Sequence, residues 1–129
     1  MFTIEAIKAA HSKVKSGADY PAYVQDLKKM GVQYYETYVT DGNAVYYGDN
    51  NFMTQSGSKY TPLNVADISD ADKFRACLKA HQQGGSDYPI FCSQAAATGI
   101  EKWVADLEKM TCTYYDRSGR EILVEQIPG

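Results

Sequence analysis

Two histidines, each followed by an aspartate, are the residues of this chain best suited to proton transfer. His11 and His81 each precede an Asp-Tyr-Pro triplet, which begins at Asp19 in one case and at Asp87 in the other. An imidazole beside a carboxylate can act as a general base near neutral pH. Two interpretations stay open: a small hydrolase-like or isomerase-like enzyme that uses these residues with the Cys92 thiol, or boundary histidines that donate to loop carbonyls.

Eleven tyrosines form a second group that could carry a function, because exposed tyrosine clusters suit partner or ligand binding. Residues 32–39 alternate as a strand does, with Tyr35 on the expected core face and Tyr34 and Tyr38 on the opposite face. Tyr34 and Tyr38 are predicted to form an exposed aromatic strip beside Tyr46 or Tyr47 on the next strand, and Tyr34, Tyr38 and Tyr46 are the candidate binding residues. Ordinary cross-strand aromatic pairing is the alternative.

Three cysteines give an odd number without a Cys-x-x-Cys pair, so no metal site is expected. When the two halves of the chain are aligned, each cysteine replaces a small or apolar residue of the other half. The matched pairs are Cys92 with Val24 and Cys112 with Ala44, and Cys77 matches Ile7 if the first helices are aligned on their histidines. Buried thiols behave as small hydrophobic groups, so we expect reduced cysteines in the core and no cofactor.

The composition is that of a soluble globular protein. The chain of 129 residues is 44% hydrophobic and 22% charged with a net charge of −3, which argues against a generic nucleic-acid binder. The first 15 residues lack a basic and then apolar leader, and no apolar stretch has membrane-spanning length, so a cytoplasmic location is expected. P-loop, dinucleotide-binding, serine-hydrolase and zinc-protease motifs are absent.

The chain repeats itself, because "GADYP" at residues 17–21 returns as "GSDYP" at residues 85–89. A shift of 68 positions matches these segments without a gap, and it also matches Gly31 with Gly99. A shift of 80 positions gives a denser local match between "YVQDLKKMGVQYY" and "WVADLEKMTCTYY", but it separates the two triplets and needs a long insertion. We favour the shift of 68, which predicts that the stretch around Trp103 is extended.

The repeat predicts two helices followed by three strands, written twice. The first helix of each half has a cap, at Thr3 or in a capping box over Ser69–Asp72, and the aspartate and proline of each triplet begin the second helix. Gly31 and Gly99 end the second helices. The predicted fold class is therefore α+β, with two tandem α-α-β-β-β repeats whose antiparallel sheet packs against the helices.

Turn residues bound five expected strands, at residues 32–40, 44–48, 100–107, 111–115 and 121–127. The third strand of the first half is less distinct, and we place it within residues 59–65, after an exposed loop over residues 49–58. The whole chain, residues 1–129, is then a single domain made of two internal repeats, about 1–68 and 69–129.

Residues 81–128 resemble the YbcV-like family, through the segment "HQQGGSDYPIFCSQAAATGIEKWVADLEKMTCTYYDRSGREILVEQIP". The stretch from "AHSKVKSGADYP" through "TDGNAVYYG" extends the resemblance over nearly the whole chain. YbcV-like proteins are small proteins of enterobacteria and their prophages that are often labelled "phage envelope protein". The resemblance implies a bacterial or prophage origin and a stand-alone cytoplasmic domain, and it brings no catalytic residues.

The favoured hypothesis is a non-enzymatic binding or accessory protein that holds a protein partner or a small ligand on its tyrosine-rich sheet face. The enzyme with a His–carboxylate pair and a phage structural component are the alternatives. Neither nucleic acid nor a membrane is an expected partner, and we expect a monomer or a homodimer.

Overall fold

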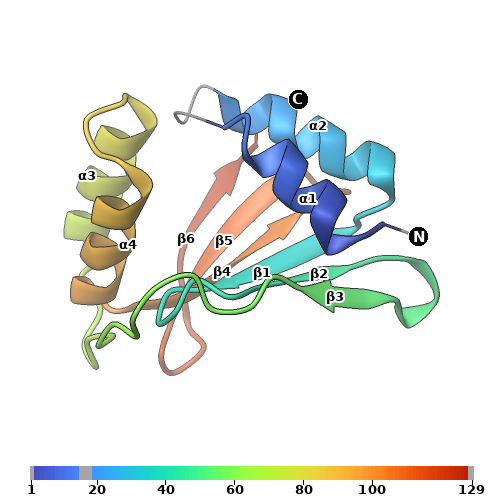
Figure 1. Cartoon of the computed structure of the whole chain (residues 1–129). Helices are drawn as coiled ribbons and strands as arrows, with labels where there is room; N and C mark the ends of the chain where they lie inside the picture. The colour runs from blue at the N-terminus through green and yellow to red at the C-terminus, as the bar shows by residue number, and fades with distance from the viewer. Residues whose placement is uncertain (1, 15–18, 128–129) are drawn as a thin grey trace.

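The computed structural model describes residues 2–14 and 19–127 as two helix pairs and an antiparallel sheet (Figure 1). The first half contains α1 (Ile4–His11), α2 (Tyr20–Met30), β1 (Tyr34–Tyr38), β2 (Ala44–Tyr47), the short 3-10 helix η2 (Asp49–Asn51) and β3 (Met53–Gln55). The second half contains α3 (Ala71–Gln82), α4 (Tyr88–Ala97), β4 (Ile100–Asp106), β5 (Thr111–Asp116) and β6 (Glu121–Gln126). The order helix, helix, strand, strand, strand occurs twice, so the predicted α+β class is confirmed.

The strands of the described residues follow the order β3-β2-β1-β4-β5-β6, and all neighbours are antiparallel. The first strands of the two halves, β1 and β4, pair at the centre, where Glu36 lies opposite Val104. The shift of 68 positions matches these same two residues, so an approximate two-fold axis passes between them. Trp103 lies within β4 and is extended, as predicted, whereas a shift of 80 positions would match helix α2 with strand β4.

Both helix pairs cover the same face of the sheet, and Figure 1 shows α1 with α2 standing apart from α3 with α4. Strand side chains alternate between the two faces of a sheet, and only the helix-facing side is fully buried along β1. There Tyr35 and Thr37 are buried, while Tyr34 and Tyr38 on the other face are half-buried. Buried residues from both helix pairs belong to one hydrophobic cluster with that sheet face, among them Ile7, Leu27, Phe74, Leu78, Phe91 and Trp103.

Side-chain caps begin three of the helices. Thr3 caps α1 as predicted, because its hydroxyl accepts from the Ala6 amide at 3.2 Å. The Asp87 carboxylate caps α4 by accepting from the Ile90 amide at 2.9 Å. The predicted capping box from Ser69 is wrong. Asp70 is the cap of α3, because its extended backbone directs the carboxylate to the Lys73 amide at 3.0 Å.

The predicted third strand of the first half is also wrong. β3 lies at Met53–Gln55, inside the stretch expected to be a loop, and residues 59–65 contain no strand. Asn50 and Asn51 have positive φ angles of 58° and 62°, which reverse the chain directly after β2. β3 therefore pairs with β2 at once, and the following segment crosses the end of the sheet through bonds such as that from the Lys59 amide to the Asp41 carbonyl.

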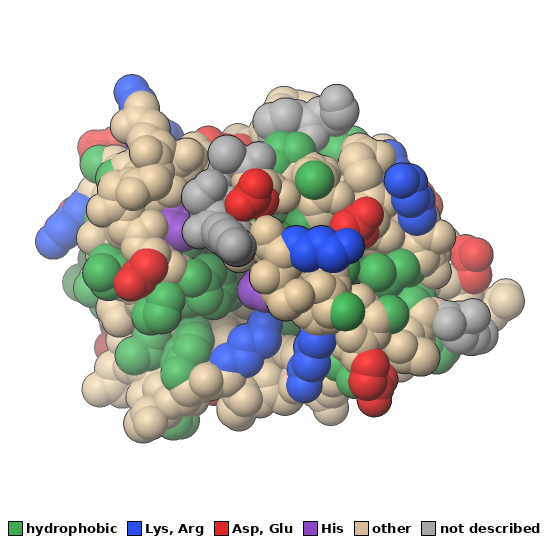
Figure 2. Space-filling model, turned by 45° about the horizontal axis from the view of Figure 1, so that its top comes forward, with side chains coloured by type: hydrophobic (Ala, Val, Ile, Leu, Met, Phe, Trp, Pro, Cys, Tyr) green, Lys and Arg blue, Asp and Glu red, His purple; other side chains and the backbone are tan. Residues whose placement is uncertain are grey.

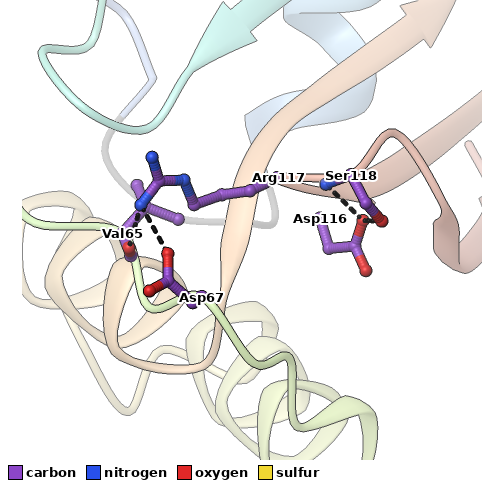
Figure 3. A network of polar contacts seen from close by, with 5 residues as sticks. All are labelled: Val65, Asp67, Asp116, Arg117 and Ser118. Carbon is purple, nitrogen blue, oxygen red and sulfur yellow. Dashed lines mark hydrogen bonds and ion pairs between the residues drawn. The ribbon is translucent and has the colours of Figure 1, made fainter.

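The segment between the two halves is held against the β5–β6 turn by a polar network (Figure 3). The Arg117 guanidinium donates to the Val65 carbonyl at 3.3 Å and to the Asp67 carboxylate at 2.8 Å. The turn itself is held by Asp116, whose Oδ1 accepts from the Ser118 amide and hydroxyl. The Arg117–Asp67 ion pair is exposed, so it contributes little stability and mainly sets the position of the linking segment.

Candidate functional site: a tyrosine-lined cavity

A cavity of about 890 Å³ lies between the two helix pairs, over the buried face of the sheet. Its walls come from α1, α2, α3, α4 and the connection between α3 and α4, and its floor crosses β1, β2, β4, β5 and β6. Sites for small molecules and cofactors commonly have volumes of about 300–1,000 Å³. Figure 2 shows hydrophobic side chains gathered in the region between the helix pairs, with the two histidine side chains at the edge of this area.

Four tyrosine hydroxyls meet in two pairs at this cavity. The hydroxyls of Tyr20 and Tyr35 are 2.5 Å apart, and those of Tyr23 and Tyr46 are 3.4 Å apart. The rings of Tyr35 and Tyr46 also stack, with centroids separated by 5.3 Å. Burial raises the pKa of all four phenols, so their hydroxyls stay protonated at neutral pH. Each hydroxyl can thus donate and accept hydrogen bonds without placing a charge in the cavity.

Aromatic rings of the second half complete the lining. Trp103 is the one tryptophan of the chain, and its ring lies 5.9 Å from those of Phe91 and Tyr114 and 6.5 Å from that of Tyr88. All four residues line the cavity. Offset and edge-to-face arrangements at these distances are favourable for aromatic pairs. The lining is therefore an aromatic surface that a flat apolar molecule can contact.

His11 lies at the end of α1, at one side of the cavity. Its ring makes edge contacts with Tyr23 at 5.2 Å and with Tyr88 at 6.4 Å. Burial, and after it the positive charge of Lys59, lower the pKa of His11. The imidazole is thus neutral at neutral pH, with one nitrogen able to accept a proton.

His81 lies at the end of α3 and lines the same cavity. Its ring stacks on Phe91 with centroids 4.6 Å apart, and its Nδ1 is 3.0 Å from the Ser86 carbonyl oxygen. The interpretation of a boundary histidine bonded to a loop carbonyl is therefore confirmed for this residue. The structure brings the two histidines to one cavity, but it bonds His81 to Ser86 and uses Asp87 as a helix cap.

Cys92 is buried in α4 near Tyr60, whose hydroxyl donates to the Val39 carbonyl at 2.5 Å. Burial raises the pKa of Cys92, and it raises the pKa of Cys112 to about 12. Both are neutral thiols at pH 7, which disfavours a nucleophilic role. The core prediction is confirmed for these two cysteines, whereas Cys77 is only half-buried because it lies at the edge of the buried stripe of α3.

The predicted aromatic strip of Tyr34, Tyr38 and Tyr46 is divided between the two faces of the sheet. Tyr46 is 3% exposed and lines the cavity, while Tyr34 and Tyr38 lie on the face that is turned away from the helices. The partner of Tyr34 is Tyr47, whose ring stacks on it at 4.4 Å. The alternative of cross-strand aromatic pairing is therefore the observed arrangement. The observed register pairs Thr37 with Ala44, and the Tyr38 amide donates to the Asn43 carbonyl. A count outward from the expected turn at residues 41–43 pairs Tyr38 with Tyr46 instead, which explains the wrong assignment of Tyr46.

The outer face of the sheet carries charge at its centre. The Lys102 ammonium and the Glu36 carboxylate form an ion pair at 3.0 Å on the central strands. The same ammonium lies 5.9 Å from the Tyr38 ring centroid and 5.6 Å from that of Tyr115. Tyr38 is thus part of a paired polar and aromatic cluster, because its hydroxyl also donates to Glu36 at 3.1 Å.

Several cavity residues were assigned no role from the sequence. Tyr20 and Tyr88 are the central residues of the two Asp-Tyr-Pro triplets, and both line the cavity. Their equivalent positions in the repeat were a signal for a shared task. Lys59 also lines the cavity, from a segment that had been predicted to be a strand. Trp103 was expected in the core, but no pattern indicated the space beside it.

The fold and the cavity define a small α+β protein with an aromatic, ligand-sized site between two helix pairs. Residues 8–126 match the family described as "Protein of unknown function (DUF1398)", and the chain belongs to that family. Among curated proteins it is similar to "Uncharacterized protein YcgX" of Escherichia coli (strain K12), with 22% identity over 116 residues, which cover 89% of this chain and 86% of that protein.

A mycobacterial protein is also similar. "Uncharacterized protein Rv2012" of Mycobacterium tuberculosis (strain ATCC 25618 / H37Rv) is 27% identical over 100 residues, which cover 74% of this chain. The match covers 59% of the length of that relative.

Two absences concern the part of the chain that the structure describes. Within residues 2–14 and 19–127, no helix combines the length and the apolar character needed to cross a membrane. Within the same residues, no group of three or more His, Cys, Asp or Glu side chains could hold a metal ion.

Proposed function

We propose that this protein binds a small, largely aromatic molecule in the cavity between its helix pairs. The observation that carries the proposal is a cavity of about 890 Å³ lined by aromatic rings and by neutral tyrosine hydroxyls. Ligand sites are typically apolar with a few placed polar groups that orient the ligand. The hydroxyl pair of Tyr20 and Tyr35 supplies such groups at the floor of this cavity.

The proposal favours binding over catalysis. A His–carboxylate enzyme would need the imidazole to bond to an aspartate, and His81 instead bonds to Ser86. Cys92 is a buried, neutral thiol, because burial raises its pKa. The proposal also moves the binding surface from the strip with Tyr34 and Tyr38 to the opposite face of the sheet.

A phage structural role finds no support in the cavity. Neither the description of the family nor the names of the relatives carry the "phage envelope" label. A virion component would be recognised by surfaces for assembly, whereas the feature described above is a cavity of the size of a small molecule.

Titration with N-phenylnaphthylamine, a neutral dye that fluoresces in apolar surroundings, tests the proposal. We expect saturable binding of one dye per chain, together with energy transfer from Trp103, which lines the cavity. Thr37 is buried in the floor of the cavity, so Thr37→Phe fills the space and should weaken binding at least tenfold.

The matched control is Val104→Phe, which adds a ring on the outer face of the sheet beside the ion pair of Glu36. This variant should bind the dye as the wild type does, and circular dichroism should show that both variants are folded. If the wild-type protein binds no dye, or binds it without energy transfer from Trp103, the proposal is wrong.

A further inference from the structure

One edge of the cavity is cationic. Lys59 lines it from the segment after β3, where the bond from its amide to the Asp41 carbonyl, at 2.7 Å, fixes the backbone. His11 lines the same cavity from the end of α1. The two side chains are near enough for the lysine charge to lower the pKa of His11. Figure 2 shows basic side chains directly beside one of the two histidines.

The acidic residues of the lining do not neutralise this lysine. The Glu125 carboxylate accepts a hydrogen bond from the Gln82 amide group at 2.7 Å, and the Asp87 carboxylate caps α4. Glu125 lies on β6, at the other end of a floor that reaches as far as β2. Among residues 2–14 and 19–127, no carboxylate forms an ion pair with Lys59.

The surroundings of Lys59 disfavour an unpaired charge. Partial desolvation lowers the pKa of Lys59, and the positive charge of Lys8 acts in the same direction, whereas Cys92 acts in the opposite direction. Because Tyr88 stays protonated, as its burial raises its pKa, the hydroxyl at this edge supplies no compensating negative charge. Lys59 is an exposed side chain that also lines the cavity, so its ammonium is accessible to an acidic group of a bound molecule.

We infer that the ligand of the cavity is an aromatic anion, whose rings lie on the tyrosine-lined floor and whose acidic group pairs with Lys59 beside His11. This inference rests on the proposed function, since it assigns the chemical class of the molecule that the cavity binds. A carboxylate or sulfonate on a flat ring system satisfies both parts of the site, because its charge meets the lysine and its rings meet the aromatic lining.

Two dyes with the same ring skeleton separate the contribution of the charge to the binding affinity from that of the rings. Anilinonaphthalenesulfonate carries a sulfonate that N-phenylnaphthylamine lacks, so the ratio of their dissociation constants reports the contribution of the anionic group. We expect the wild-type protein to bind the sulfonate dye roughly tenfold more tightly than the neutral dye. Lys59→Gln should lower the affinity for the sulfonate dye roughly five- to tenfold and change that for the neutral dye less than twofold.

Matched variants test whether the charge of Lys59 is responsible. Lys29→Gln removes the same charge from an exposed position of α2 outside the cavity, and it should leave both affinities unchanged. Lys59→Arg keeps the charge and should retain most of the preference for the sulfonate dye. If circular dichroism shows that Lys59→Gln is unfolded, both dyes are instead titrated into the wild-type protein at increasing salt concentration. Salt should then weaken the binding of the sulfonate dye and leave the binding of the neutral dye unchanged.

The outcomes distinguish the inference from the proposed function. Saturable binding of the neutral dye with no preference for the sulfonate dye overturns the anion inference and leaves the cavity as a binding site. An equal loss of both dyes in Lys59→Gln also overturns it, because the lysine would then act through the fold. Failure of both dyes to bind the wild-type protein overturns the proposed function and the inference that rests on it.

Discussion

The tyrosines of the two Asp-Tyr-Pro triplets, Tyr20 and Tyr88, line one cavity from the two helix pairs. Each lies at the beginning of a helix whose proline is compatible with the first turn, and each side chain lines the cavity. A helix start is a rigid platform, so it holds the ring and its hydroxyl in a defined place. The triplet thus both starts the helix and positions the tyrosine side chain.

His11 makes the stability of the protein depend on pH. Its pKa in the folded state is lower than the ordinary value of 6.5, because burial and Lys59 disfavour the imidazolium. The rings of Tyr23 and Tyr88 that face it are neutral. The unfolded chain therefore binds the proton more readily, and the free energy of unfolding falls as the pH decreases below about 6.5.

Urea unfolding of the wild type and of His11→Gln, at pH values of about 7.5 and 5.5, measures this contribution. The free energy of unfolding should fall less in the variant than in the wild type between the two pH values, since the variant has no imidazole to protonate. An equal fall in both proteins would show that His11 contributes nothing to the pH dependence.

The ends of α2 and α4 allow a comparison of two glycines in equivalent positions. Gly31 and Gly99 have φ angles of +101° and +87°. An added Cβ at Gly31 would meet no atom within 4 Å, whereas at Gly99 it would lie 2.6 Å from the Ser69 Cα. Gly31→Ala should cost about 1 kcal/mol from backbone strain alone. Gly99→Ala should cost about 3 kcal/mol, because the backbone before α3 must also move.

The free energies of unfolding of the two variants, from urea titration at one pH, decide the comparison. Equal losses would mean that the close approach to Ser69 relaxes without cost, so that only the positive φ angle matters.

Local signals predicted most of the elements. Glycines with positive φ end or follow α2 and α4, and alternating side chains define β1 and β4, so these elements could be read from neighbouring residues alone. The position of β3 depends on the left-handed conformation of Asn50 and Asn51, which reverses the chain. The composition of this segment predicts a loop, but it does not indicate whether the chain reverses within it. Tyr46 was placed on the wrong face because a one-residue change of register exchanges the faces of a strand.

The cavity exists only in the whole molecule. Its lining combines Tyr20, Tyr23 and Tyr35 from the first half with Trp103 and Tyr114 from the second. The alternation of the strands assigned Tyr35 and Trp103 to the core face, which their burial confirms. It could not indicate that the two helix pairs stand apart over the shared sheet (Figure 1), because no short-range pattern encodes that separation.

The last prediction concerns cooperativity, and it tests the interpretation of the chain as a single domain made of two repeats. β1 and β4 pair over five positions, and one hydrophobic cluster contains residues of both helix pairs. Loss of either half would expose the central strand and the buried aromatic residues of the other. Urea unfolding followed by Trp103 fluorescence and by far-ultraviolet circular dichroism should therefore give coincident transitions.

Two variants extend the test to each half. Leu27→Ala in α2 and Leu78→Ala in α3 remove buried side chains, and each should lower the free energy of unfolding by about 2–5 kcal/mol. Because the halves share strands and core, each variant should shift both signals together. If Leu27→Ala leaves the fluorescence transition of Trp103 unchanged while the circular dichroism splits into two steps, the halves fold independently. The cavity would then lie between two independently folding domains.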